Sequence, residues 1–157
     1  DAKFAPAYIA RSYLYILLAQ EYRAGPQRDQ FELALQAALQ DLKNARTLTP
    51  KDATIYNYLG LVSQLKGNID QAIQNYKKAI QLEPNYPVYY NDLGAAYYHL
   101  QKYALAEQAL NKAIGLDKDY ALAYKNRAEV RFQLGKYREA KEDIEVLARI
   151  APEIFEL

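Results

Sequence analysis

The sequence repeats itself every 34 residues, and this period limits the folds that the chain can adopt. Three segments align without gaps, residues 55–84, 89–118 and 123–152. One position of the alignment holds Tyr56, Tyr90 and Tyr124, and another holds Gly60, Gly94 and Ala128. A period of this length indicates a row of similar units, each of which buries its apolar side against its neighbours.

Each repeat has the pattern of two short amphipathic helices. In residues 89–118, apolar side chains recur at spacings of three and four, around Leu93 and Tyr97 in the first half and around Ala106 and Leu110 in the second. Polar tripeptides, "KGN", "QKY" and "GKY", separate the two halves. Each repeat is therefore predicted to be a helical hairpin.

Local signals mark the ends of these helices. Gly67 and Gly135 are predicted to cap first helices at their carboxyl ends, where glycine accepts a left-handed conformation. Asp52 and Asn85 are predicted N-caps, and Pro87 fits a first helical turn because its missing N–H is not needed there.

Gly60 and Gly94 stand inside predicted helices, where glycine costs about 1 kcal/mol relative to alanine. We expect them to face Ala72 and Ala106 on the second helices. Small residues on both sides let two helix axes approach closely. Closer packing is then expected to offset the cost of the glycine.

These residues resemble the tetratricopeptide repeat (TPR) family. The second repeat matches the family pattern at Tyr56, Leu59, Gly60, Ala72, Tyr76, Ala79 and Pro84. Ser63 departs from the pattern, and Arg127 weakens the match of the last repeat. The resemblance implies an all-α fold, a right-handed α-solenoid of stacked antiparallel hairpins. We expect a single TPR domain over residues 1–157, with repeats at about 5–50, 53–86, 87–120 and 121–152 and a tail at 153–157.

The first repeat is expected to be an elongated hairpin. Residues 1–11 align with residues 117–127, but the alanine that should follow Tyr8 after 16 residues is Ala38, 30 residues away. The apolar periodicity continues through the 14 extra residues. We therefore expect both helices to be about two turns longer, with a turn at residues 24–30. The alternative is a disordered loop insertion.

Composition excludes several functions. The net charge of +1 gives no bulk attraction to nucleic acid, no apolar run could span a membrane, and there is no cysteine. His99 is the only histidine, and no catalytic, metal-binding or phosphate-binding motif occurs. We read "KEDIE", residues 141–145, as a solvated helix face. We expect no active site, no cofactor and no metal, and we assign the tyrosines mainly to packing.

Function is then expected on the face that stacking leaves open. In the family, the first helices of successive hairpins line a concave groove, which implies a protein or peptide partner. The predicted partner-binding residues are Asn57, Tyr58, Leu61, Asn91, Asp92, Tyr98, Lys125, Asn126, Glu129 and Phe132. Such a module would serve as an adaptor, scaffold or assembly factor. The alternatives are a structural or oligomerisation segment of a longer solenoid and the regulatory module of an enzyme.

Two further expectations concern the groove and the ends. One group within the family captures a partner's C-terminal carboxylate with Lys, Arg and Asn on three successive first helices. The corresponding positions here are Asn57, Leu61, Asp92, Leu122 and Asn126, so the basic residues are missing and no carboxylate clamp is predicted. The last segment, "APEIFEL", carries Ile154, Phe155 and Leu157, and self-association through uncapped ends is a further expectation.

Overall fold

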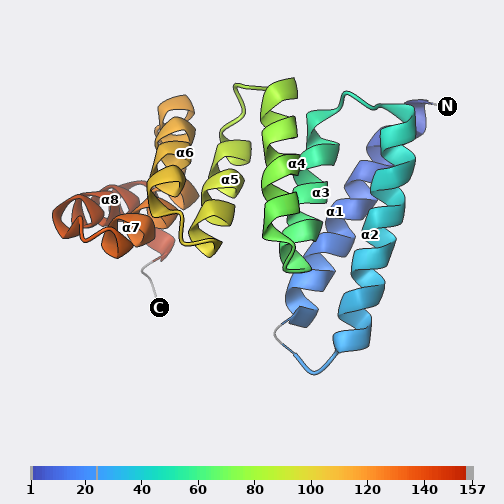
Figure 1. Ribbon diagram of the computed structural model, residues 1–157, viewed down its shortest axis with the longest axis horizontal. Coiled ribbons are helices and arrows are strands. Elements are labelled where there is room, and N and C mark those ends of the chain that lie inside the picture. The colour runs from blue at the N-terminus through green and yellow to red at the C-terminus, as the bar shows by residue number, and fades with distance from the viewer. Residues whose placement is uncertain (1, 24, 155–157) are drawn as a thin grey trace. The chain divides into compact units, whose positions relative to one another are not determined.

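The computed structural model describes residues 2–23 and 25–154, and all its regular elements are helical (Figure 1). The eight α-helices of this part of the chain are α1 (Ala5–Arg23), α2 (Arg28–Leu48), α3 (Ala53–Leu65), α4 (Ile69–Leu82), α5 (Pro87–His99), α6 (Tyr103–Leu116), α7 (Ala121–Gln133) and α8 (Tyr137–Ile150). Short 3-10 helices, η1 (Ala2–Phe4) and η2 (Pro152–Ile154), stand before α1 and after α8.

The helices pair as antiparallel hairpins within two compact units, residues 1–84 and residues 85–157. In the first unit α1 pairs with α2 and α3 with α4, and α3 also packs against α1 and α2. In the second unit α5 pairs with α6 and α7 with α8, and α7 packs against α6 and α5. The predicted all-α architecture of stacked hairpins is confirmed.

The first hairpin is elongated, as predicted. Helix α1 has 19 residues and α2 has 21, whereas α3 has 13 and α4 has 14. The turn of this hairpin projects beyond the turn between α3 and α4 (Figure 1). The predicted turn at residues 24–30 is too long, because α2 already begins at Arg28. Asp29 in the first turn of α2 favours this earlier start through the helix dipole; Ala24 lies outside the described residues.

The glycines inside the first helices make room for large side chains of the second helices, and Gly94 also faces the backbone of Ala106, as expected. A Cβ atom on Gly60 would lie 2.4 Å from the ring of Tyr76, which is fully buried. A Cβ atom on Gly94 would lie 2.7 Å from Cγ of Leu110 and 3.3 Å from the carbonyl oxygen of Ala106. For Gly60 the expected partner was Ala72, but the side chain that fills the space is Tyr76, which comes one helical turn later.

The turns inside the last three hairpins share one backbone design. The N–H groups of Asn68, Lys102 and Lys136 donate to carbonyl oxygens five residues earlier, at 2.8, 2.9 and 2.9 Å. The residue before each of these donors is left-handed: Gly67 with φ 81°, Gln101 with φ 56° and Gly135 with φ 73°. This is the Schellman arrangement, in which glycine is favoured. The predicted capping role of Gly67 and Gly135 is confirmed.

The two predicted N-caps differ in outcome. Asp52 is the N-cap of α3, and its carboxylate accepts a hydrogen bond of 2.9 Å from the backbone N–H of Thr54. The N-cap prediction for Asn85 is wrong, because α5 begins at Pro87 and Tyr86 takes the cap position. Pro87 occupies the first turn of α5, as expected.

Ion pairs to buried carboxylates join the helices of the first and last hairpins. Arg11 on α1 donates two hydrogen bonds of 2.7 Å to Asp41 on α2, and Arg127 on α7 donates two bonds, of 3.0 and 2.6 Å, to Asp143 on α8. Both carboxylates are buried. The reading of residues 141–145 as a wholly solvated face is therefore wrong for Asp143. The sequence separations, 30 and 16 residues, differ by the 14 extra residues of the first hairpin.

Candidate functional site

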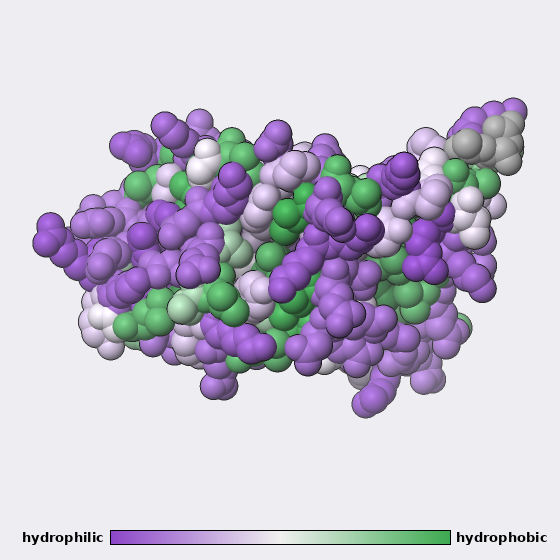
Figure 2. Space-filling view, turned by 45° about the horizontal axis from the view of Figure 1, so that its top comes forward, coloured by the Kyte–Doolittle hydropathy of each residue, from purple (hydrophilic) through white to green (hydrophobic). Residues whose placement is uncertain are grey.

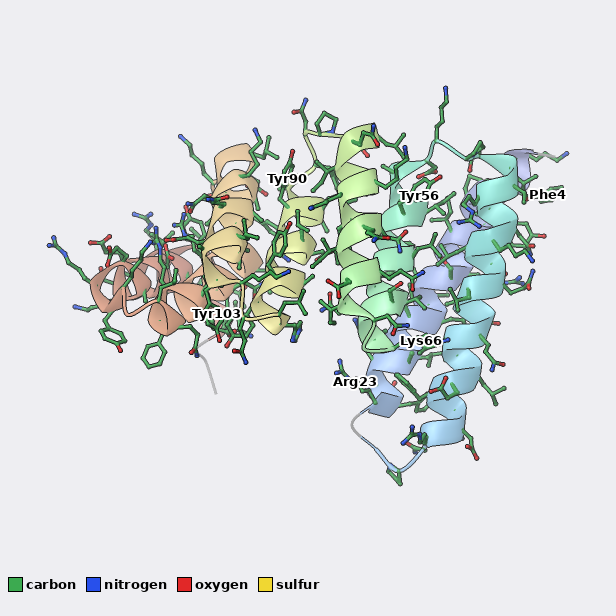
Figure 3. All side chains as sticks on the ribbon, in the orientation of Figure 1. Phe4, Arg23, Tyr56, Lys66, Tyr90 and Tyr103 are labelled. Carbon is green, nitrogen blue, oxygen red and sulfur yellow. The ribbon has the colours of Figure 1, made fainter. Side chains whose placement is uncertain are left out.

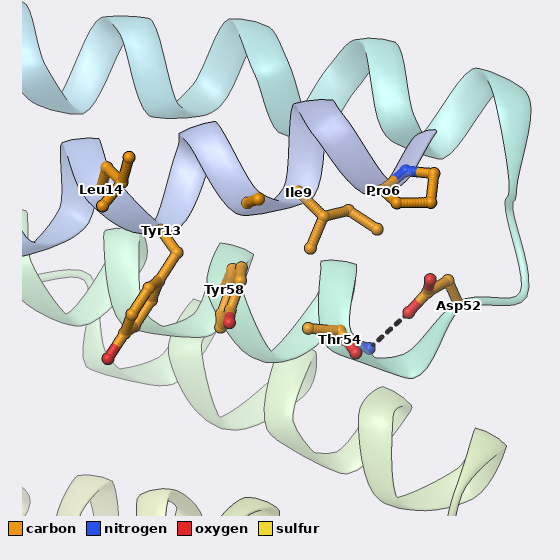
Figure 4. A pocket seen from close by; sticks show the side chains of 8 residues that line it. Pro6, Ile9, Tyr13, Leu14, Asp52, Thr54 and Tyr58 are labelled. Carbon is orange, nitrogen blue, oxygen red and sulfur yellow. Dashed lines mark hydrogen bonds between the residues drawn. The ribbon is translucent and has the colours of Figure 1, made fainter. Parts of the chain in front are cut away.

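The first unit has a pocket between its first helices, α1 and α3 (Figure 4). Its volume is about 570 Å³. The lining residues are Pro6, Ile9, Ala10, Tyr13, Leu14, Asp52, Thr54 and Tyr58. Most of these side chains are apolar, and Asp52 places one carboxylate at the edge.

Two tyrosines form one wall of this pocket. The rings of Tyr13 and Tyr58 stack with centroids 5.3 Å apart and planes 20° apart (Figure 4). Such a pair is worth about 0.5–1.5 kcal/mol beyond its buried area, so it holds both rings in a defined position. Beside it, Leu14 is 59% exposed. Hydrophobic side chains also reach the surface at several places on the face shown in Figure 2.

The structure places the ten predicted partner-binding residues at three depths. Asn57 and Asn91 are buried, with 3% and 2% of their surface exposed. The half-buried residues are Tyr58, Leu61, Asp92, Tyr98 and Asn126. The exposed residues are Lys125, Glu129 and Phe132. The two buried asparagines offer little surface to a partner, and their direct contact with one stays a prediction.

In the second unit a short polar network joins α5 and α7. The amide of Asn126 donates a hydrogen bond of 2.8 Å to Oδ1 of Asn91, and the amide of Asn91 donates one of 3.3 Å to Asp92. Burial raises the pKa of Tyr120 above its ordinary value, and the negative charge of Asp92 raises it further. The buried Asn91 thus links α5 to α7 through its hydrogen bond with Asn126. Asp92 adds negative charge beside this link.

Two apolar pockets adjoin this network, and Tyr98 and Glu129 line both. The smaller pocket, about 140 Å³, is lined by Gly94, Ala95, Tyr98, His99, Leu110, Asn126, Glu129 and Val130. The larger, about 460 Å³, is lined by Tyr98, Ala128, Glu129, Phe132, Gln133, Tyr137, Ala140, Lys141 and Ile144. The rings of Phe132 and Tyr137 meet edge to face, with centroids 5.3 Å apart.

Tyr98 also supports the fold. It packs against the core cluster of α6 and α7, and its ring lies 5.6 Å from that of Tyr103. The sequence predicted Tyr98 as a partner-binding residue, and the structure shows that the same side chain also packs against the core. Phe132, which is 60% exposed, is the better isolated probe of this surface.

The sequence reasoning missed the α1 side of the first pocket. Pro6, Ile9 and Ala10 occupy the repeat positions of Leu122, Lys125 and Asn126, because residues 1–11 align with residues 117–127. Extending the predicted face one hairpin toward the N-terminus would have found them.

The described residues show no arrangement suited to other chemistry. No group of three or more His, Asp or Glu side chains within residues 2–23 and 25–154 could hold a metal ion. In the same part of the chain, no helix combines the length and the apolar character that crossing a bilayer requires. The single histidine, His99, is exposed at the end of α5.

Comparison with protein families gives two matches. The family model described as "TPR repeat" matches residues 64–101, and the one described as "Tetratricopeptide repeat" matches residues 87–120. None of the curated proteins matches the chain.

Several solved structures are similar. The first TPR of Spaghetti (RPAP3), bound to the HSP90 peptide SRMEEVD, is 35% identical with a TM-score of 0.65, and the match covers 68% of this chain and 86% of that one. The first TPR domain of human RPAP3 is 35% identical with a TM-score of 0.64, covering 66% and 81%. MamA, 24% identical with a TM-score of 0.69 and covering 86% and 75%, shows the same fold.

Proposed function

Because the chain belongs to the tetratricopeptide repeat family, we propose that it is a non-catalytic module that binds a peptide or helix of a partner protein on the open faces of its first helices. The observation that carries the proposal is the pocket between α1 and α3, with its stacked Tyr13 and Tyr58 and its exposed Leu14. Exposed apolar surface around a concave site is typical of binding surfaces. Peptide binding by the RPAP3 relative supports this use of the fold.

The chemistry of the faces indicates which part of a partner is bound. In the relative the bound peptide is SRMEEVD. The five positions of a carboxylate clamp carry no lysine or arginine here, and one of them is Asp92. A free carboxylate would therefore meet negative charge without a cation to pair with. We propose that apolar or aromatic side chains of the partner enter the pocket, and that its C-terminal carboxylate is not recognised.

In the second unit, we propose that Asp92, Lys125, Asn126 and Glu129 supply polar contacts and that Phe132 supplies an apolar anchor. Lys125, Glu129 and Phe132 are exposed, and Tyr98, Glu129 and Phe132 line one pocket. An adaptor, scaffold or assembly factor would use such a surface. A regulatory module attached to an enzyme would use the same surface, and the longer reading frame distinguishes the two.

The test begins with peptides selected by display on the chain of residues 1–157. Selected peptides should contain bulky apolar residues, and Leu14→Ala should weaken their binding about tenfold or more, because apolar anchors carry most of an interface's binding energy. Leu33→Ala is the matched control, since Leu33 on α2 is 63% exposed and lies outside the pocket. Equal effects of the two substitutions would contradict the α1–α3 site.

A second comparison uses the peptide SRMEEVD itself. We expect no binding at micromolar concentration, and no difference between the free and the amidated C-terminus. Micromolar binding of SRMEEVD that is lost on amidation would show that a carboxylate clamp exists despite the missing basic residues.

Phe132→Ala tests the second unit with the peptides selected by display, and Leu105→Ala on α6 is its control, because both side chains are exposed.

A further inference from the structure

From Phe4 in η1 along helix α1, the chain exposes a row of residues whose repeat counterparts are buried or half-buried. The row, here called the α1 stripe, consists of Phe4, Ala7, Arg11, Leu14 and Leu18. The alignment of residues 1–11 with residues 117–127, continued along the helix, gives their counterparts on α7 and at its two caps: Tyr120, Ala123, Arg127, Val130 and Leu134. Spacings of three and four place the whole stripe on one side of its helix.

The two rows differ sharply in exposure. On α7, Ala123, Val130 and Leu134 pack with the core residues of α6. Val130 is 1% exposed, whereas Leu14 is 59% exposed. Ala123 is buried, whereas Ala7 is exposed. Phe4, at the outer edge of the first hairpin (Figure 3), is exposed as well. The α1 stripe is thus suited to pack against a helix like α6.

The complementary surface lies on α8. The α8 face consists of Tyr137, Lys141, Ile144, Glu145 and Ala148, and one repeat earlier the same positions on α6 are Tyr103, Glu107, Leu110, Asn111 and Ile114. Helix α7 covers Leu110 and Ile114, which are buried in the α6–α7 core. Ile144 is 40% exposed, and Ala148 is exposed.

The arginine of the α1 stripe has a carboxylate of opposite charge on the α8 face, Glu145. Arg127 uses Nε and Nη2 to hold Asp143 and donates from Nη1 to Oδ1 of Asn111 on α6 at 2.7 Å. Arg11 uses the same two nitrogens to hold Asp41, and its Nη1 has no hydrogen-bond acceptor in the described part of the chain.

The environment of the two arginines is also alike. The guanidinium of Arg11 lies 5.7 Å from the ring centre of Tyr8, and that of Arg127 lies 5.3 Å from the ring centre of Tyr124. The counterpart of Asn111 on α8 is Glu145, an exposed carboxylate that lies 3.4 Å from Nζ of Lys141 on the same helix. If a helix with an arginine like Arg11 packed on α8 as α7 packs on α6, this arginine would pair with the carboxylate of Glu145. In the contact between α7 and α6, Arg127 donates instead to the neutral amide oxygen of Asn111.

From this correspondence we propose that a second copy of the chain docks its α1 stripe on the α8 face, as α7 packs on α6. Leu14 of one copy takes the place of Val130 beside Ile144 of the other, and Arg11 pairs with Glu145. The contact joins two different surfaces, so it is head to tail, and each copy keeps one of the two surfaces available for the next.

Sedimentation velocity on residues 1–157, from about 1 µM to about 500 µM, tests the proposal. We expect the average mass to rise with concentration beyond that of one chain. Ala7→Glu blocks the α1 stripe and Ala148→Glu blocks the α8 face; both alanines are exposed, so each variant should fold and remain monomeric. Mixing the two variants should restore association, but only as a dimer, because each contributes one intact surface.

Ala104→Glu, at an exposed alanine on α6 outside both surfaces, is the control and should associate like the parent. Glu145→Arg should weaken association several-fold, whereas Glu142→Arg, at a similarly exposed carboxylate on the same helix, should not. A parent chain that stays monomeric would overturn the proposal. So would a mixture of Ala7→Glu and Ala148→Glu chains that fails to form dimers, or an Ala7→Glu variant that still associates alone.

Discussion

At the scale of single residues, Asp143 is the most heavily constrained side chain of the last hairpin. It accepts two hydrogen bonds from Arg127 and lies 2.8 Å from Nη1 of Arg131, while only 2% of its surface is exposed. The same positions one repeat earlier hold Leu93 and Ala109, an apolar pair. The last hairpin thus places an ionic pair at two repeat positions where the preceding hairpin has an apolar pair.

This comparison predicts the effect of removing the carboxylate. Asp143→Ala leaves two arginines in a largely buried site without their shared anion, and we expect it to lower the free energy of unfolding by about 3–5 kcal/mol. The double variant Arg127→Leu, Asp143→Ala imitates the pair at Leu93 and Ala109, so it should recover most of that loss. Urea unfolding of the three chains measures both effects. If the double variant is no more stable than Asp143→Ala, an apolar pair cannot replace the ionic pair at these two positions.

Glu107 on α6 predicts a dependence of stability on pH. Burial alone would raise the pKa of this carboxyl, but hydrogen bonds from Lys136 and Arg131 outweigh burial and lower the pKa below its ordinary value of 4.5. The contribution of these contacts is therefore complete above about pH 4.5 and is lost as the pH falls through the lower pKa of the folded chain. We expect Glu107→Gln to reduce the loss of stability between about pH 5 and pH 3. Denaturation curves of both chains at several pH values across that range measure this loss. A Glu107→Gln variant whose free energy of unfolding falls with pH as steeply as that of the parent would contradict the prediction.

The left-handed residue Gln101 predicts a stabilising substitution. Its counterparts in the neighbouring hairpins are Gly67 and Gly135, and a side chain in this conformation costs about 1 kcal/mol. Gln101→Gly should therefore raise the free energy of unfolding by about 0.5 kcal/mol, part of the gain being lost to the freer unfolded chain. Gly67→Gln is the reciprocal change and should destabilise by about 1 kcal/mol. The same direction of change in both variants would show that the φ angle is not the cause.

At the scale of helices and hairpins, periodicity and turn residues predicted most of the fold. The repeat located every hairpin, and the 14 extra residues of the first one are visible as its longer helices. The partner of Gly60 was missed because repeat alignment states which positions are equivalent but not which side chains interlock. Tyr76 was matched to the family pattern without any sign that its ring fills the space beside that glycine.

The candidate site was less predictable than the fold. Helical spacing correctly put Phe132, Glu129 and Lys125 on an exposed face, yet it could not show that Asn91 lies beneath that face. Depth depends on the neighbouring helix, and Asn91 is held by Asn126. The α1 side of the pocket between α1 and α3 was missed because the predicted face began at the second hairpin, although residues 1–11 align with residues 117–127.

At the scale of the whole molecule, the proposal of one TPR domain over residues 1–157 leads to a test of cooperativity. We expect a single unfolding transition, with far-ultraviolet circular dichroism and tyrosine fluorescence giving the same midpoint. Asp143→Ala should then shift the entire transition, although its site lies in the second compact unit. Two separable transitions, only one of them shifted, would show that residues 1–84 and 85–157 unfold independently.

The first hairpin is a spacer, because its two helices are longer than those of the second hairpin. Its two helices exceed their counterparts α3 and α4 by six and seven residues, about 1.7 and 1.9 turns, so both helices are extended by nearly the same length. Shortening both helices together by two turns would preserve the contact of Arg11 with Asp41 at the base. Shortening only one would leave the other without a partner along its tip. The reach of the projecting turn is thus a property that can be tuned in matched steps, independently of the surfaces at its base.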